Sequence, residues 1–192
     1  MTEFTDLYIM LGPPNSGKGT QAASMAARLG LHHLSSGDAF REAVASGSQV
    51  GRLAGSYIEA GDLVPDDLVI DVILERLENL SAEGCGTILD GFPRTTEQAE
   101  ALDARIGDKG LKIRAVVSIE VGQEELLRRA ALRGRDDDRP EVARRRFEVY
   151  EQLTLPLADY YERCGLLVRI DGERPIEVVT NAILDSVMAL TS

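Results

Sequence analysis

The sequence predicts an α/β fold in which five parallel strands form one sheet with helices on both faces. Short β-branched or apolar runs alternate with helix-patterned stretches along the chain, an order typical of a parallel sheet covered on both sides. The length of 192 residues suits one sizeable core rather than two. We therefore expect a single domain over residues 1–192.

The expected elements alternate regularly, with two exceptions. We expect strands at 7–11, 32–35, 87–90, 115–119 and 166–170. We expect helices at 19–29, 38–46, 50–60, 66–80, 97–106, 123–133, 140–164 and 175–190. Three helices between the second and third strands are too many for one crossover, so an all-helical insertion is expected between Gly37 and Leu80. The polar segment 134–139 joins two helices and is a candidate mobile lid.

Capping residues and prolines support several of these boundaries. Thr95, with Gln98 three residues later, predicts a capping box at one helix start. Pro140 and Pro175 each suit a first helical turn. Pro156 should kink or divide the longest expected helix.

Composition limits the class of partner. The formal net charge of -11 and the pI near 4.7 argue against a nucleic-acid or anionic-membrane surface, because both select for broad positive patches. Cys85 and Cys164 stand far apart without a C-x-x-C partner, which indicates neither a disulfide framework nor a zinc site. His32 and His33 are interpreted as structural, because nothing near them forms a triad or a ligand set. The acidic N-terminal segment has no apolar h-region, so we expect a cytoplasmic protein, and we expect a monomer.

A glycine-rich segment at residues 12–21 has the context of a phosphate-binding loop. It follows the apolar strand at 7–11 and precedes a helix, so its backbone N–H groups and the helix N-terminus can surround an anion. Lys18 would supply a charge to the outer phosphates and Thr20 a hydroxyl near a metal. Asn15 stands where glycine would be easiest, and asparagine is the residue that otherwise tolerates positive φ best.

Charged side chains also follow the next two strands, where ligand groups gather in parallel sheets. Asp90 and Arg94 come after the third strand, where the carboxylate could hold the water shell of magnesium and the guanidinium could face an anion. A structural turn pair is the alternative. Asp38 and Arg41 follow the second strand, where Asp38 could merely cap a helix. Arg41 in a first helical turn opposes the dipole, a conflict that a bound anion would relieve.

Eight arginines stand within 19 residues of this acidic chain. We interpret Arg128, Arg139, Arg144 and Arg145 as solvated surface residues. The other four are Arg129, Arg133, Arg135 and Arg146. They could surround a transferring phosphoryl group, where catalysis consists of positioning and charge stabilisation.

From about Leu7 to Val187 the sequence resembles the adenylate kinases. The matching segments are GPPNSGKGTQ, LSSGDAFR, AGDLVPDDLV, LDGFPRTTEQAEAL, RGRDDD with the following RRRFEVY, LPLADYY and VRIDGERP. The resemblance implies a P-loop, nucleoside-monophosphate kinase fold with a core (1–35, 84–133, 140–192), a helical monophosphate-binding insertion (about 36–65) and a short lid (about 133–140). It also implies reversible transfer from MgATP to AMP, giving two ADP. The lid lacks the zinc-binding cysteines of long-lid members, so magnesium and no zinc is expected.

The resemblance also implies roles for individual residues. ATP would meet Asn15, Ser16, Gly17, Lys18, Gly19, Thr20, Arg129, Arg133 and Arg174. AMP would meet Ser36, Arg41, Asp62, Leu63, Val64, Gly91, Phe92, Pro93, Arg94, Gln98, Arg135 and Arg146. The catalytic set would be Lys18, Arg94, Arg129, Arg133, Arg135 and Arg146, with magnesium held through water near Asp38 and Asp90. The family usually has threonine at the Ser36 position, so this contact would keep its donor and lose a methyl group.

Two alternatives differ in what they bind. A uridylate, cytidylate or other monophosphate kinase would share the loop and the arginines. Gln98 argues against it, because its amide can pair with the adenine edge where pyrimidine-specific relatives typically carry asparagine. A GTP-dependent switch or a one-site nucleotide sensor lacks support, because there is no Asn-Lys-x-Asp motif and the two arginine sets fit two phosphate chains.

Overall fold

The computed structural model describes residues 5–81, 83–133 and 139–191. Its centre is a five-stranded parallel sheet with the order β2-β3-β1-β4-β5. The strands are β1 (Thr5–Leu11), β2 (His32–Ser35), β3 (Thr87–Asp90), β4 (Leu111–Glu120) and β5 (Leu167–Asp171). The predicted α/β class and the parallel sheet are confirmed.

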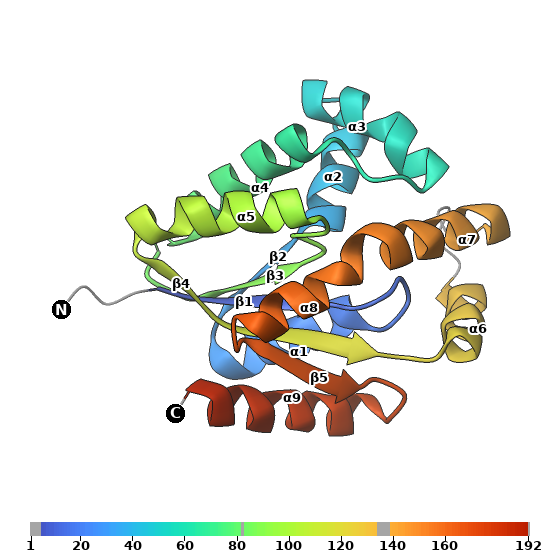
Figure 1. Ribbon diagram of the computed structural model, residues 1–192. Helices are drawn as coiled ribbons and strands as arrows, with labels where there is room; N and C mark the ends of the chain where they lie inside the picture. The colour runs from blue at the N-terminus through green and yellow to red at the C-terminus, as the bar shows by residue number, and fades with distance from the viewer. Residues whose placement is uncertain (1–4, 82, 134–138, 192) are drawn as a thin grey trace.

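Helices cover both faces of the sheet (Figure 1). One face packs against α1 (Lys18–Leu29) and α9 (Ile176–Thr191), and the other packs against α4 (Asp66–Ser81), α5 (Thr96–Ile106) and α8 (Pro156–Arg163). Strand β1 shows why helices pack on both faces, because it has apolar side chains on each face of the sheet. Leu7, Ile9 and Leu11 belong to one core cluster, while Tyr8 and Met10 belong to the other.

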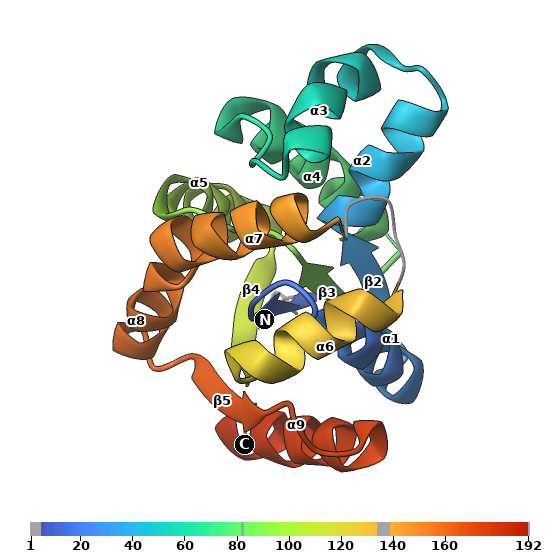
Figure 2. The ribbon, with the colours of Figure 1, turned by 90° about the vertical axis from the view of Figure 1, so that its right-hand side faces the viewer.

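The segment between β2 and β3 is helical, as expected. It contains α2 (Ser36–Ala45), α3 (Gln49–Ala60) and α4. Helices α2 and α3 pack against each other and stand above the carboxyl ends of the strands (Figure 2). Helix α4 packs instead against α5, β2 and β3, so it belongs to the core layers. Only the first part of the expected insertion therefore projects from the sheet.

The chain between 140 and 164 differs from the single helix expected there. It divides into α7 (Pro140–Val149), a π-helical turn (Tyr150–Thr154) and α8. Proline at 156 has no N–H to continue the α-helical pattern, and the N–H of Leu155 reaches the Tyr150 carbonyl at 2.8 Å. The prediction that Pro156 divides this helix is confirmed.

Two smaller differences concern element ends. Strand β4 starts four residues earlier than expected, because Leu111 and Ile113 point into the core while Lys112 is exposed. Helix α9 begins at Ile176, so Pro175 precedes its first turn. The remaining elements are α6 (Gln123–Arg133) and a short 3-10 turn (Gly107–Lys109). Within the residues that the structure describes, no helix has the length and apolar character needed to cross a membrane.

Candidate active site

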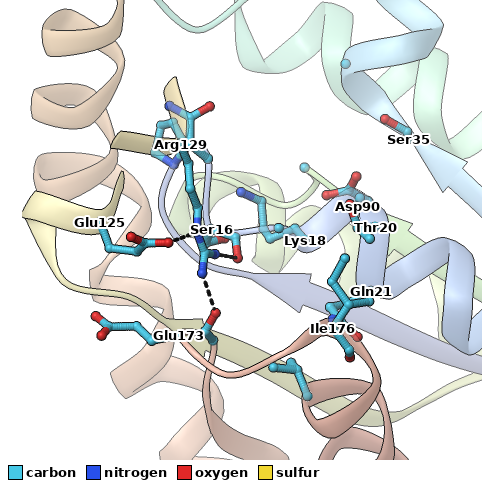
Figure 3. Close-up of a pocket in the computed structure, with 18 of the residues that line it drawn as sticks. Ser16, Lys18, Thr20, Gln21, Ser35, Asp90, Glu125, Arg129, Glu173 and Ile176 are labelled. Carbon is cyan, nitrogen blue, oxygen red and sulfur yellow. Dashed lines mark hydrogen bonds and ion pairs between the residues drawn. The ribbon is translucent and has the colours of Figure 1, made fainter. Parts of the chain in front are cut away.

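A cleft of about 850 Å³ opens at the carboxyl ends of the strands. Its walls come from the loop between β1 and α1, the ends of β2 and β3, helix α6 and the loop after β5 (Figure 3). Many of the charged residues singled out in the sequence line it. They are Lys18, Asp38, Arg41, Asp90, Arg94, Arg128, Arg129, Arg146 and Arg174.

The glycine-rich loop has the geometry expected of an anion cradle. Helix α1 starts at Lys18 without a side-chain cap, so its first N–H groups face the cleft. Asn15 has φ 67°, which confirms that this position needs the left-handed region. A Cβ on Gly12 would lie 2.7 Å from the Ile119 carbonyl oxygen, so only glycine fits at φ 145°. The Lys18 ammonium donates to the Pro13 carbonyl at 2.9 Å, which holds it over the loop.

Three arginines from different elements meet beside this loop. Arg41 comes from α2, Arg94 follows β3 and Arg146 comes from α7, and all three line the cleft and the smaller cavity next to it. Burial and the nearby Arg146 lower the pKa of Arg94 to about 10, with Asp90 opposing and Arg41 adding to the shift. Arg146 and Arg41 lower this pKa because their charges repel that of Arg94 in the folded protein. Such a cluster indicates an anion site, because a bound phosphate would remove this repulsion.

The end of β3 carries an ionised carboxylate. Burial alone would raise the pKa of Asp90, but the approach of His33 and the charges of Lys18 and Arg94 outweigh it, so the pKa is lowered. The His33 imidazole Nε2 lies 3.6 Å from Asp90 Oδ2. His33 was interpreted as structural, and the structure adds that it lines the cleft beside Asp90. Its position follows from β2 pairing with β3, a neighbour relation that the sequence does not reveal.

A second, smaller cavity of about 80 Å³ adjoins the arginines. It has apolar walls from Phe40, Leu63, Val64 and Val69, and a polar end at Gln98. The Gln98 Oε1 accepts from the Arg94 N–H at 2.8 Å, and its Nε2 donates to Asp66 at 2.7 Å. The amide orientation is therefore fixed. A flat ring with a hydrogen-bonding edge would suit such a cavity.

Two expectations about these polar residues need correction. Thr95 accepts from the Gln98 N–H, but the Gln98 side chain turns to the Arg94 N–H instead of completing the capping box. The Ser36 hydroxyl was expected to keep a donor for a ligand. It donates to the Gly91 carbonyl at 2.6 Å, so its oxygen can only accept from a ligand in this arrangement.

The far end of the cleft is built around Arg129 (Figure 3). Its guanidinium donates to Glu125, to the Ser16 carbonyl and to the Gly172 carbonyl. Arg174 pairs with Asp171 at 2.9 Å and is 65% exposed. Glu125, Glu173 and Gln21 also line this end, and the sequence reasoning did not single them out. The i,i+4 spacing of Glu125 and Arg129 was the available signal.

Some predicted residues lie elsewhere or outside the described chain. Phe92 is 1% exposed and packs in the hydrophobic core, so its side chain is not available to a ligand. Pro93 lines a separate small cavity behind Arg94 and Arg146. Arg135 lies outside the described residues, and so does the side chain of Arg133 at the end of α6. Asp62 pairs with Arg145 at 2.7 Å, so Arg145 is not a purely solvated residue.

The oxygen donors in the cleft fit a hydrated magnesium ion. The ionised Asp90 and the Asp38 carboxylate share the cleft with Thr20, and such hard oxygen groups suit magnesium held through its waters. Asp38 also accepts from Arg41 at 2.6 Å. In the described parts of the chain, no group of three His, Cys, Asp or Glu is placed to hold a metal directly. The absence of zinc stays a prediction.

A glycine-rich loop at the carboxyl ends of a parallel sheet, in one cleft with a second cluster of cations, defines a P-loop nucleotide-binding protein. The sequence model described as adenylate kinase matches residues 10–166. The chain belongs to the adenylate kinase family.

Individual relatives agree with this family over nearly the whole chain. An adenylate kinase of Methylorubrum populi is 45% identical over 185 residues, covering 91% of this chain and 92% of the relative. One of Thermus thermophilus is 49% identical over 168 residues, covering 85% and 87%. One of Azorhizobium caulinodans is 47% identical over 190 residues, covering 94% and 97%.

Proposed function

We propose that this chain transfers the terminal phosphoryl group of ATP to AMP and back, giving two ADP. The observation that carries the proposal is the meeting of two subsites at one arginine cluster. The glycine-rich loop lies on one side of Arg41, Arg94 and Arg146, and the cavity that ends at Gln98 lies on the other. Two nucleotides bound in these subsites would face each other through their phosphates.

The ATP subsite would use the loop and the far end of the cleft. Residues 15–20 would bind the phosphates through backbone N–H groups and the Lys18 ammonium. Arg129 and Arg174 would meet the adenine, and Arg133 would reach the phosphates. The residues of this set whose side chains the structure describes, which are all except Arg133, line the same cleft, and this supports the assignment.

The AMP subsite would use the smaller cavity and its cations. Its phosphate would meet Arg41, Arg94, Arg135 and Arg146. The adenine would meet the backbone at Asp62 to Val64, with its edge toward Ser36 and Gln98. Gly91 and the backbone of Asp62 would complete the walls, whereas Phe92 would contribute only through its backbone. The Ser36 oxygen can accept from an exocyclic amino group, a donor that adenine carries and uracil lacks.

The chemistry would need no covalent intermediate on the protein. Lys18 and the arginines would stabilise the charge that spreads over the transferring group, and the subsites would hold donor and acceptor in line. Asp38 and Asp90 would hold magnesium through water, and the ion would neutralise charge on the phosphate oxygens when it is bound with ATP. The His33 contact would keep Asp90 oriented for this task.

Arrangement and location complete the proposal. We propose that residues of about 36–65 form the AMP-binding insertion and that about 133–140 form a short lid over the core. The chain would act as a monomer in the cytoplasm. Sedimentation at concentrations above and below those of the assay would test the monomer.

The test is a coupled assay with ATP and each of AMP, UMP, CMP and GMP as acceptor. AMP should give a kcat/KM well above the others, because a site that hydrogen-bonds one base edge leaves polar groups unpaired with another. A bisubstrate dinucleotide, with two adenosines joined by five phosphates, should stabilise the protein more than ATP at matched saturation. Equal rates with UMP would refute the choice of AMP. A dinucleotide effect no larger than that of ATP would refute the two-site arrangement.

A further inference from the structure

All three nitrogens of the Arg129 guanidinium have hydrogen-bond acceptors within the protein. The Nε atom donates to Glu125 Oε1 at 2.7 Å, one terminal nitrogen donates to the Ser16 carbonyl at 3.1 Å and the other to the Gly172 carbonyl at 2.8 Å. These acceptors belong to α6, the phosphate loop and the turn after β5 (Figure 3). The edge of the guanidinium is therefore occupied on three sides.

When all three nitrogens of a guanidinium donate hydrogen bonds within the protein, its flat faces remain available to a ligand. Arg129 is 24% exposed and lines the cleft, together with Gly172 and Arg174. It also lies over the glycine-rich loop, because a Cβ on Gly17 would come within 3.9 Å of its terminal nitrogen. Planar guanidinium groups stack on aromatic rings and nucleobases. At this place the stacking partner would be the base of a nucleotide whose phosphates occupy the loop.

Glu125 is the one acceptor of this set that is a side chain. It is itself restrained, because Arg128 binds the same carboxylate through two hydrogen bonds of 2.6 and 2.7 Å. Hydrogen bonds from Arg128 and Arg129 lower the pKa of Glu125 to about 2, so it stays ionised at any working pH. A carboxylate fixed by one arginine can set the plane of the other.

We infer that Glu125 is a positioning residue that holds the face of Arg129 against the base of ATP. The inference rests on the proposed function, since it takes the loop to bind ATP. Without Glu125 the Nε group loses its partner, and only the Ser16 and Gly172 carbonyls still hold the guanidinium, so its plane is less firmly fixed. Stacking on the base is then weakened, while the phosphates keep the loop and Lys18.

The experiment compares two probes that differ in the base. Binding of ATP and of inorganic tripolyphosphate is measured by calorimetry for the wild type, Glu125→Ala and Glu125→Gln. Glu124→Ala is the matched control, because Glu124 is exposed in the same turn of α6. Thermal unfolding of each variant checks that it is folded.

Glu125→Ala should weaken ATP about three- to thirtyfold, the range for a stacked cation, and tripolyphosphate less than twofold. Glu125→Gln keeps one acceptor oxygen and should lie between Glu125→Ala and the wild type. In the AMP assay the KM for ATP should rise while the KM for AMP stays unchanged. The Glu124→Ala control should match the wild type with both probes.

Two results would overturn the inference while leaving the proposed function intact. Equal weakening of ATP and tripolyphosphate would place the effect at the phosphates, and unchanged ATP binding would show that Arg129 needs no support from Glu125. A wild type that binds tripolyphosphate as tightly as ATP would instead refute the proposed adenine subsite itself.

Discussion

Replacing Arg94 with methionine should stabilise the unliganded protein while abolishing transfer to AMP. Arg94 is held beside Arg146 and Arg41, and burial together with Arg146 lowers its pKa from 12.5 to about 10. The protonated form of Arg94 is therefore less stable in the folded protein than in the unfolded chain. A lowering of that size corresponds to ~3 kcal/mol of stability lost at neutral pH, at about 1.4 kcal/mol for each pKa unit.

The substitution also removes a hydrogen bond, which reduces the gain. The Arg94 Nε donates to the Gly91 carbonyl at 2.7 Å, a contact worth about 1 kcal/mol. That carbonyl still accepts from the Ser36 hydroxyl at 2.6 Å, so it is not left unpaired. The net gain is then ~2 kcal/mol. For a chain of this size, it should raise Tm by about 4 to 8 °C.

The assay is thermal unfolding in phosphate-free buffer between pH 7 and 9. Arg105→Met is the control, because Arg105 is exposed in the last turn of α5 and its loss should change stability by less than about 0.5 kcal/mol.

The pH dependence has a defined sign. Below about pH 10 Arg94 is charged in both states, so the advantage of Arg94→Met stays constant. Above that pH Arg94 loses its proton in the folded wild type before it does so in the unfolded chain. The wild type then becomes relatively more stable, so the difference in stability between Arg94→Met and the wild type becomes smaller. An Arg94→Met variant that is less stable than the wild type throughout pH 7 to 9 would refute the reasoning.

Three further predictions concern other parts of the site. Lys18→Met should keep its fold and lower kcat at least about a hundredfold, because one preorganised contact with the transferring group is lost; single-turnover measurements would contradict this role if the rate were kept. Asp66→Asn removes a charged acceptor from Gln98, so the ratio of kcat/KM for AMP to kcat/KM for UMP should fall about tenfold. An unchanged ratio would exclude Asp66 from base selection. Asn15→Gly should be tolerated, whereas Asn15→Val should cost about 1 to 3 kcal/mol at φ 67°, as measured by urea unfolding; equal midpoints would show that the loop relaxes.

The phosphate loop could be predicted from the sequence because its physics is local. A strand, a turn with positive φ at Asn15 and Gly17, and a helix start at Lys18 occupy consecutive residues. The same holds for the strand at 32–35 and the helix at 123–133, whose predicted bounds the structure reproduces. In these segments the residues that fix the structure are near neighbours in the chain.

Contacts between distant segments set the limits of sequence prediction. His33 reaches Asp90 only because β2 lies next to β3, and the Gln98 amide is oriented by Asp66 from another helix. Phe92 was placed by the resemblance alone, which matches the position but does not say which way a side chain points. The structure turns it into the core.

The arginines of the cleft have different tasks, and their partners show which. Arg41 pairs with Asp38 where both are at least 40% exposed, so an arriving phosphate can exchange for this carboxylate at little cost. Arg129 is fixed by Glu125 and two carbonyls, which use all three nitrogens of its guanidinium. Such a group suits stacking through its flat face better than hydrogen bonding to a phosphate. Arg94 has a carbonyl acceptor and two arginines nearby, whose repulsion contributes to its lowered pKa. Because a phosphate removes that repulsion, we expect anion binding and folding stability to be coupled more strongly at Arg94 than at the other described arginines of the cleft.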